Sequence, residues 1–291
     1  MAVASALVQE QRGYLGQLLR NRKFAVGIGI ILTLVALAAL GNLFVDPVQR
    51  RTGSFPARLP PGPGGPLGTD SLGRSIAIQM SEAVPNSLQV GLIAATVGTL
   101  LGAVIGFVSG YFGGIVDALL RILIDVFLSV PSLVFLILIA SLVRGMEVQT
   151  MALVIGAFAW PSPARQVRAQ VLSLKERAFV QVARLSGVSG LGIIFRELMP
   201  LMLPWLGANF VNAFIAAILA ESGLSLLGLG PQKEMTLGMM IYWALSYSAI
   251  LQNLWWWWLI PVLTLMLLFL SLYLIHLGFD EVSNPRLRTQ V

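Results

Sequence analysis

The sequence predicts an all-α polytopic membrane protein with six transmembrane helices. Of its 291 residues, 57% are hydrophobic and 11% are charged, and the mean hydropathy is +0.83. A soluble domain has about a quarter of its residues charged, so this composition indicates a chain that is mostly embedded in lipid. A helical span needs about 20 mostly apolar residues. The uncharged intervals that reach or approach this length are 24–45, 83–116, 126–143, 148–164, 198–220 and 235–279.

The first expected span, 24–45, follows a tail (1–23) whose end carries Arg20, Arg22 and Lys23. We interpret it as an uncleaved span, because it is longer than the apolar region of about 7–15 residues in a signal peptide. The next segment, 46–82, is expected to be an extracytoplasmic loop. Its many prolines and glycines favour turns and extended chain. The loop is either a passive linker or a contact surface for an external partner.

Residues 83–279 are expected to form a five-helix core. Asp117, Arg121 and Asp125 precede its second span at intervals of four residues, which places them on one face of a helix. A charge at the bilayer centre is costly, so we expect these three at the membrane edge. In one interpretation, Arg121 forms an ion pair with Asp117 or with Asp125 that orients the helix. Alternatively, these charged residues take a direct part in transport.

The last apolar interval, 235–279, is too long for a single crossing. We expect the crossing near 254–277 and an interfacial or re-entrant segment at 232–253. Four consecutive tryptophans, Trp255–Trp258, are expected to anchor the crossing at the outer interface, where indole rings concentrate. His276 is expected to lie beside Asp280, in contact with water. A C-terminal tail is expected to cover 280–291.

The distribution of basic residues predicts the orientation. With the N-terminus in the cytoplasm, 13 of the 19 Lys and Arg residues lie on the cytoplasmic side and six lie outside. This bias fits the positive-inside rule, so both termini are expected in the cytoplasm. The net charge of +6 therefore reflects topology, and we expect no nucleic-acid binding.

Several chemistries are excluded by the residue inventory. The chain has no cysteine and one histidine, so a Cys/His metal site and a cysteine nucleophile are not expected. None of its three lysines follows a glycine and precedes Ser or Thr, as the phosphate-binding loop of an ATPase requires. We expect no enzyme activity, no metal and no cofactor in this chain, and ATP chemistry would belong to another polypeptide.

The segment 165–196 carries six of the 19 basic residues between two expected spans. From Lys175 to Leu185 it contains neither Pro nor Gly and shows an amphipathic pattern. Gly187 and Gly190 are expected to stop this helix. The small residues Ala183 and Gly187 would let another protein approach the backbone closely. The pattern alone fits both a docking helix for a soluble partner and a helix that rests on lipid.

The run Glu176–Gly187, followed by Leu198-Met199-Pro200, resembles the Glu-Ala-Ala…Gly…Ile-x-Leu-Pro loop of ABC importer permeases. Gln181 and Val182 replace the Glu and the first Ala of that pattern, Glu197 and Met199 replace its Ile and Leu, and the spacing of Ala183, Gly187 and Pro200 is kept. Further blocks resemble the dipeptide/oligopeptide permeases, in particular their C-type subunit. These blocks are Leu67–Arg74, Gly110–Gly114, Glu221–Gly230 and Asn284–Arg288.

This resemblance implies the type I permease fold of ABC importers, with six transmembrane helices, in a bacterial cytoplasmic (inner) membrane. It implies a homologous second permease, two ATPase subunits that bind ATP and Mg, an external solute-binding protein and a peptide substrate. Segment 176–190 would be the coupling helix that docks on an ATPase. The expected docking residues are Arg177, Ala178, Gln181, Val182, Ala183, Arg184 and Gly187.

Two asparagines of the fifth expected span, and the glutamate that directly follows it, are candidates for the translocation path. Asn209 and Asn212 either line the path or form hydrogen bonds between helices, and Glu221 either binds a peptide ammonium at the outer interface or caps the span in water. The alternative function is a secondary transporter or channel that works without an ATPase. That class needs ionisable groups at mid-membrane and often has two related halves, and the sequence shows neither.

Overall fold

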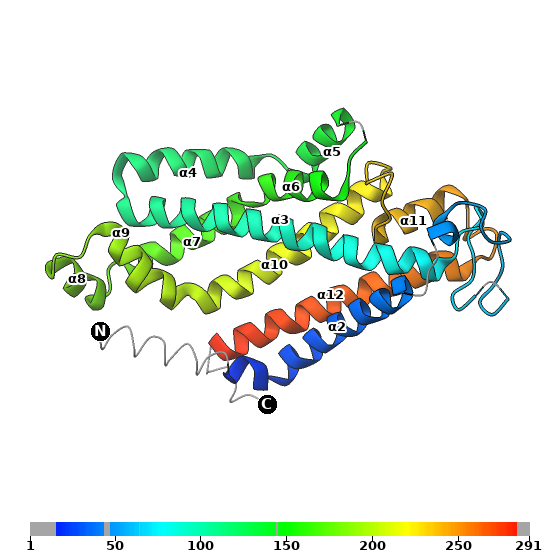
Figure 1. Ribbon diagram of the computed structural model, residues 1–291. Helices are drawn as coiled ribbons and strands as arrows, with labels where there is room; N and C mark the ends of the chain where they lie inside the picture. Colours follow the sequence, from blue (N-terminus) through cyan, green and yellow to red (C-terminus); the bar gives the residue numbers. More distant parts are fainter. Residues whose placement is uncertain (1–15, 44–46, 64, 144, 284–291) are drawn as a thin grey trace.

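The computed structural model describes residues 16–43, 47–63, 65–143 and 145–283, which form an elongated bundle of helices (Figure 1). The tail block Asn284–Arg288 and most of the N-terminal tail lie outside the described residues. The elements are α2 (Arg22–Leu43), η1 (Pro47–Arg50), α3 (Ile76–Phe112), α4 (Gly114–Ser129), α5 (Ser132–Leu142), α6 (Val148–Ala159), α7 (Pro161–Leu174), α8 (Ala178–Leu185), α9 (Gly190–Ile193), the π-helical turn η2 (Ile194–Leu198), α10 (Met199–Leu226), α11 (Leu237–Ser246) and α12 (Trp255–Ser283).

Four helical segments of the described chain are long and apolar enough to cross a membrane: α2, α3, Gly190–Leu226 and α12. A fifth is counted if α4 and α5 form one span, although they bend by 76° at their junction. The expected interval 148–164 is divided between α6 and α7, which meet at Trp160 and are 12 and 14 residues long. The multi-pass, all-helical class is confirmed, whereas the count of six spans is not.

Several boundaries differ from those expected. Helix α3 begins at Ile76, so the end of the expected loop 46–82 is already helical. The expected third span is broken at Pro131, whose ring and missing N–H interrupt a helix. Gly190 does not stop a helix but begins α9. Helix α11 occupies the segment expected to be interfacial or re-entrant, before the crossing by α12.

The two ends of the bundle carry different elements. The start of α2, the end of α12 and the short helix α8 lie toward one end, whereas the loop 47–75 and α11 lie at the other (Figure 1). The segment predicted to dock a soluble partner is thus at the opposite end from the predicted extracytoplasmic loop. We call the end with the loop the outer end.

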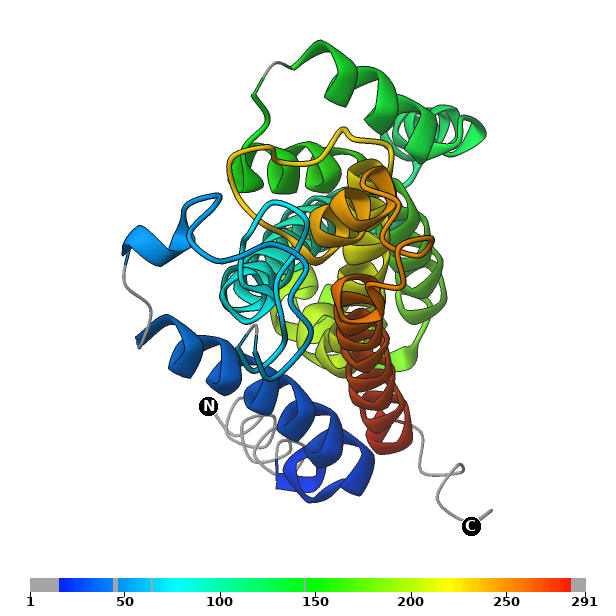
Figure 2. The ribbon, with the colours of Figure 1, turned by 90° about the vertical axis from the view of Figure 1, so that its right-hand side faces the viewer.

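Helices α2 and α12 lie side by side at one edge of the bundle (Figure 2). A Cβ atom on Gly278 would lie 2.7 Å from Cβ of Phe24, so the two helices meet at close range. Glu281 forms an ion pair with Lys23 and accepts a hydrogen bond from Asn21 Nδ2 at 2.8 Å. These contacts fix α2 against α12.

A stripe of glycines joins α3 to α6 and α7. Gly98, Gly102, Gly106 and Gly110 occur every fourth residue, on one face of α3. A Cβ atom on any of them would lie 2.6–2.8 Å from a Cβ atom of the facing helices, at Ala159, Pro163, Val167 and Val171 respectively. Small residues at this spacing let membrane helices approach closely, so α3, α6 and α7 form one tightly packed unit.

We predict that Gly102→Leu destabilises the protein by about 1–3 kcal/mol, the usual cost of overpacking a tight interface. The matched control is Gly29→Leu, because Gly29 is exposed on α2 and a Cβ atom there meets nothing within 4 Å. Leucine favours a helix over glycine by up to about 1 kcal/mol, so the control is expected to be neutral or stabilising. Thermal unfolding of both purified variants in detergent checks this, and equal melting temperatures would contradict the close packing.

Candidate functional site

The predicted docking segment contains the short helix α8, at the tip of the bundle (Figure 1). Its inner side is held by Val180, which is fully buried against a cluster that includes Val171 of α7 and Leu198. Its outer side exposes large apolar side chains: Val182 is 62% exposed and Leu185 is 88% exposed. An amphipathic helix with this orientation is available to a partner.

The end of α8 is a glycine turn. Gly187 has φ of +78°, a conformation that costs other residues about 1–2 kcal/mol. The Val188 amide donates to the Ala183 carbonyl and the Gly187 amide donates to the Arg184 carbonyl, both at 3.1 Å. This pair of bonds is the Schellman motif that ends many helices, so the sequence prediction that Gly187 stops the helix is confirmed.

The seven residues predicted to dock lie together on or beside α8. Ala183 is half-buried, and the other six are exposed. The Arg184 guanidinium lies 5.9 Å from the ring centroid of Tyr111, which fixes the helix against the end of α3. Leu185 was not among the seven predicted docking residues. Its position next to Arg184 on a short helix could have indicated that it is exposed. That these residues contact an ATPase stays a prediction.

A charged clamp joins α4 to α7, the helix that leads into α8. Arg168 donates to Asp117 through Nε at 2.6 Å and through Nη2 at 2.7 Å, and Ser109 Oγ donates to the same carboxylate at 2.5 Å. Both partners are about 20% exposed. The expected pairs of Asp117 and Asp125 with Arg121 are therefore wrong, because each aspartate of α4 pairs with an arginine of α7.

Two further contacts support the clamp. Asp125 lies 3.6 Å from Nη2 of Arg165, in a pair whose side chains are at least half exposed. Lys175, which follows α7, donates from Nζ to the Gly110 carbonyl at 3.0 Å. The base of α8 is thus connected to both α3 and α4.

A cavity of about 570 Å³ lies between the α4–α5 bend, the α6–α7 junction and α10. Most of its lining is apolar, and the polar members are Ser132, Ser162, Gln166, Asn209 and Asn212. None of the described residues that line it is charged. Its volume is within the usual range of about 300–1,000 Å³ for small-molecule sites. It can therefore accommodate a ligand that has apolar side chains and whose polar groups carry no net charge.

The three candidate path residues are not in one place. Asn209 and Asn212 line this cavity, and Asn209 donates to the Trp205 carbonyl at 3.0 Å, one turn back in its own helix. Glu221 is 0% exposed and is not among the residues that line it. The expected position of Glu221 at an outer interface in contact with water is not observed, because α10 continues to Leu226 and α11 packs over it.

Hydroxyl groups surround Glu221. Thr236 Oγ1 and Ser225 Oγ donate to Oε1 at 2.6 and 2.8 Å, and Ser222 Oγ lies 3.4 Å from Oε2. A Cβ atom on Gly238 would lie 3.2 Å from Oε1, so this glycine lets α11 approach the carboxyl group. The cluster fixes α11 to the end of α10.

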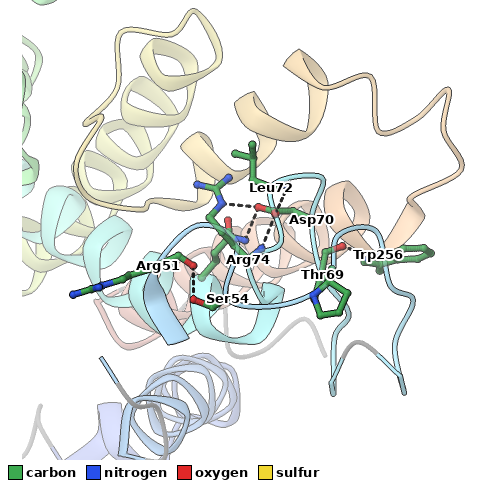
Figure 3. A network of polar contacts seen from close by, with 9 residues as sticks. Arg51, Ser54, Thr69, Asp70, Leu72, Arg74 and Trp256 are labelled. Carbon is green, nitrogen blue, oxygen red and sulfur yellow. Dashed lines mark hydrogen bonds and ion pairs between the residues drawn. The ribbon is translucent and has the colours of Figure 1, made fainter. Parts of the chain in front are cut away.

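The loop 47–75, at the outer end, is folded around the carboxylate of Asp70 (Figure 3). Asp70 is 0% exposed and accepts four hydrogen bonds: at Oδ1 from the amides of Leu72 and Arg74, at 2.8 and 2.9 Å, and at Oδ2 from Arg74 Nε and Gln79 Nε2, at 2.7 and 3.0 Å. All its strong acceptor positions are used within the loop and the first turn of α3. This segment is therefore not a structureless linker.

The tryptophan run packs against this loop. Trp256 donates from Nε1 to the Thr69 carbonyl at 3.0 Å (Figure 3). Trp257 is fully buried. Trp255 is 51% exposed. The interpretation of all four as interfacial anchors is thus wrong for Trp256 and Trp257, which belong to the core. His276 Nε2 lies 3.2 Å from Asp280 Oδ2, as expected. Its side chain is only 19% exposed and its Nδ1 lies 3.2 Å from the Ala208 carbonyl, so the expectation that His276 is solvated is wrong.

Apolar helices of membrane-spanning length, a neutral cavity and an exposed amphipathic helix at one end define a multi-pass membrane protein of the permease class. The chain belongs to the family described as the binding-protein-dependent transport system inner membrane component, which matches residues 74–289. This family consists of membrane permease subunits of ABC transporters, not of catalytic domains, so the sequence-based resemblance is confirmed.

Individual relatives cover most of the chain. A Brucella suis protein named as a peptide transport system permease is 31% identical over 275 residues, which are 94% of this chain and 91% of the relative. The oligopeptide transport system permease protein OppC of Mycobacterium tuberculosis is 31% identical over 227 residues, 77% of each chain. A second Brucella suis protein, named as a peptide permease, is 34% identical over 222 residues, 76% of this chain and 72% of the relative.

Proposed function

We propose that this chain is a permease subunit of an ATP-driven importer of dipeptides or oligopeptides in a bacterial inner membrane. It forms the translocation path with a homologous second permease, and it works with two ATPase subunits and an external solute-binding protein. Both termini and α8 lie in the cytoplasm, and ATP and Mg are bound by the ATPases. The peptide substrate is supported by the names of the relatives in Brucella and Mycobacterium.

The observation that carries this proposal is the exposed helix α8 with its glycine turn. An apolar face with Val182 and Leu185, bordered by Arg177 and Arg184, suits a groove on a soluble protein. The chain has no phosphate-binding loop of its own, so its energy has to arrive through a partner. Helix α8 is held to the bundle by its buried side and by the Lys175 contact, which would pass the movement of a docked ATPase to α7.

The cavity is the proposed part of the path that this subunit contributes. Its polar groups are amides and hydroxyls, which can bond to peptide groups without selecting a charge. The wall formed by the α4–α5 bend is connected to α7 through the Asp117–Arg168 clamp. Movement of α7 would therefore change the shape of the cavity.

Gly187→Arg in the reconstituted complex is expected to reduce peptide uptake and substrate-stimulated ATP hydrolysis at least about tenfold. The reason is that the left-handed conformation costs a side chain about 1–2 kcal/mol, and 1.4 kcal/mol corresponds to a factor of ten. In addition, the bulky side chain would stand where the partner approaches. Gly187→Asn separates the two effects, because asparagine tolerates this conformation but still adds bulk.

Gly53→Arg is the matched control, because Gly53 is also exposed, has φ of +80° and lies at the outer end. It is expected to retain ATPase subunits during purification, whereas Gly187→Arg loses them. Unchanged uptake and hydrolysis in Gly187→Arg would contradict docking through α8. Uptake by this chain alone in liposomes, driven by an ion gradient, would instead support a secondary transporter.

A further inference from the structure

The chain has a single histidine, His276, in the last part of α12. This part of α12 lies toward the end of the bundle that carries α8, and α12 packs against both α2 and α10 (Figure 1). The His276 side chain is only 19% exposed. It neither lines the cavity that contains Asn209 nor belongs to α8, so the function proposed above does not explain its position.

Each ring nitrogen of His276 faces an oxygen atom that accepts hydrogen bonds. Nδ1 lies 3.2 Å from the Ala208 carbonyl of α10, and Nε2 lies 3.2 Å from Oδ2 of Asp280. A carbonyl and an ionised carboxylate cannot donate, so both bonds need an N–H from the ring. A neutral imidazole has one N–H, whereas the imidazolium has two. The arrangement is therefore complete only when the ring carries both protons.

The bond from Nδ1 joins α12 to α10 at a place where these helices already meet closely. A Cβ atom on Gly207 would lie 2.6 Å from the ring of Phe279. The Phe279 ring in turn packs edge-on against Phe24 of α2, with the ring centroids 5.6 Å apart. Asn209, the residue after Ala208, lines the cavity of α10. This contact therefore connects the α2–α12 edge of the bundle to one wall of the cavity.

The charged groups around the imidazole leave Asp280 as its counter-ion. Asp280 is the charged group within ion-pair distance of His276 in the described part of the chain. Glu281, the next residue, pairs with Lys23 of α2, where Arg22 is exposed. Helix α10 brings no charge to this contact, because residues 198–220 contain no charged side chain. The ion pair with Asp280 thus favours the charged form of the ring, and the Ala208 carbonyl uses its second N–H.

Loss of one proton would leave one N–H for two acceptors. Histidine is the side chain whose charge normally changes between pH 5 and 8. If Nδ1 keeps its proton, the bond to Asp280 breaks, and if Nε2 keeps its proton, α10 loses its bond to α12. In both cases the ring no longer attracts the Asp280 carboxylate. The contact between α10 and α12 thus depends on the proton concentration.

We propose that His276 is a proton-dependent link between α12 and α10. As the imidazolium it binds the Ala208 carbonyl and the Asp280 carboxylate together, and on deprotonation it releases one of them. The link depends on neither the transported substrate nor the ATPases, so its test is independent of the proposed transport function. With the termini in the cytoplasm, as proposed above, the proton comes from the cytoplasm, and acidification there holds α10 more firmly in place.

Nuclear magnetic resonance of ¹⁵N-labelled histidine in the full chain measures this link directly. The chain has one histidine, so a purification tag without histidine leaves only the ring signals of His276. In detergent at about pH 6 we expect protons on both ring nitrogens, one of which is lost as the pH is raised above about 8. In Asp280→Asn the second proton is expected to bind severalfold more weakly, because the counter-ion is gone.

The melting temperature of the chain in detergent gives a second measurement. The folded chain offers the second proton two acceptors that the unfolded chain lacks, so the melting temperature is expected to fall between about pH 6 and about pH 8. The chain has no cysteine and no other histidine, so few other groups change charge in this range. His276→Gln is expected to lose most of this pH dependence. The matched control is Tyr273→Gln, at an exposed position on the same helix, which is expected to keep it.

Three results would overturn the proposal. These are a neutral His276 ring already at about pH 6, the same titration in Asp280→Asn as in the unchanged chain, or an equal pH dependence of melting in His276→Gln and Tyr273→Gln. If His276→Gln does not fold, the titrations of the unchanged chain and of Asp280→Asn decide the outcome.

Discussion

Asp70→Ala is expected to destabilise the protein by about 3–5 kcal/mol, the usual cost of removing one partner of a buried ion pair. The carboxylate is 0% exposed and Arg74 is only 14% exposed. Removal of the Asp70 carboxylate would leave four donors without their acceptor in a site that water reaches poorly. These donors are the Arg74 guanidinium, the Gln79 amide nitrogen and two backbone amides. The loop 47–75 would lose its fixed position above Trp256.

Two variants make this prediction specific. Asp70→Asn keeps one carbonyl oxygen but turns an NH₂ group toward donors, so an intermediate loss is expected. Arg58→Ala removes only an exposed hydrogen bond to Ser71 Oγ at 3.3 Å, and surface changes of this kind are usually within about 0.5 kcal/mol. Thermal unfolding in detergent and limited proteolysis of the loop measure the effect. A melting temperature of Asp70→Ala equal to that of Arg58→Ala would contradict the buried network.

Hydropathy predicted which parts of the chain are apolar helices, but not how these helices are divided. The apolar runs that became α2, α10 and α12 were found because each is long and free of charges. The bend of 76° between α4 and α5 was not expected, although Pro131 is a visible signal for it. The start of α3 at Ile76 was missed because the expected spans were uncharged intervals, and the charge of Glu82 ended the interval at residue 83. In the structure Gln79 and Glu82 lie in the first turns of α3, where they line a pocket of about 160 Å³.

The local signal at Gly187 was reliable, whereas the one at Gly190 was not, and the long-range partners were not predicted correctly. The end of α8 could be predicted because the conformation of Gly187 follows from its own chemistry. The partner of Asp117 could not, because Arg168 is 51 positions away and Arg121 is an equally plausible neighbour by spacing. Trp256 and Glu221 show the same limit: a hydrogen bond from residue 256 to residue 69, or from residue 236 to residue 221, depends on tertiary packing.

The Asp117–Arg168 clamp connects two parts of the molecule that the proposed function requires to move together. Helix α7 continues through Lys175 into α8, and α4 leads to the bend at Pro131 that lines the cavity. The glycine stripe already fixes α3 to α7. In contrast, α4 exposes large apolar side chains along most of its length, such as Ile115 and Leu119. Its attachment to α7 therefore depends on the clamp and on Ile124, which is buried in a cluster with Trp160 and with Ala164 of α7.

Asp117→Arg is expected to reduce peptide uptake by the reconstituted complex at least about tenfold. The substitution places two guanidinium groups together where hydrogen bonds to a charged group had contributed about 1.5–3 kcal/mol, and 1.4 kcal/mol corresponds to a factor of ten. ATP hydrolysis by the docked ATPases is expected to continue, because α8 keeps its buried contacts through Val180. The ratio of peptide imported to ATP hydrolysed is thus the quantity that decides the outcome.

The reversed pair Asp117→Arg with Arg168→Asp is expected to restore part of this ratio, since it again places opposite charges across the α4–α7 contact. Disruption of the neighbouring pair by Asp125→Asn provides the control: Asp125 is 50% exposed and 3.6 Å from Arg165, and such surface pairs contribute about 0–1 kcal/mol. An unchanged ratio in Asp117→Arg would mean that α4 follows α7 without the clamp. A parallel loss of uptake and hydrolysis would instead place the effect at the docking of α8, because a broken connection above α8 affects uptake alone.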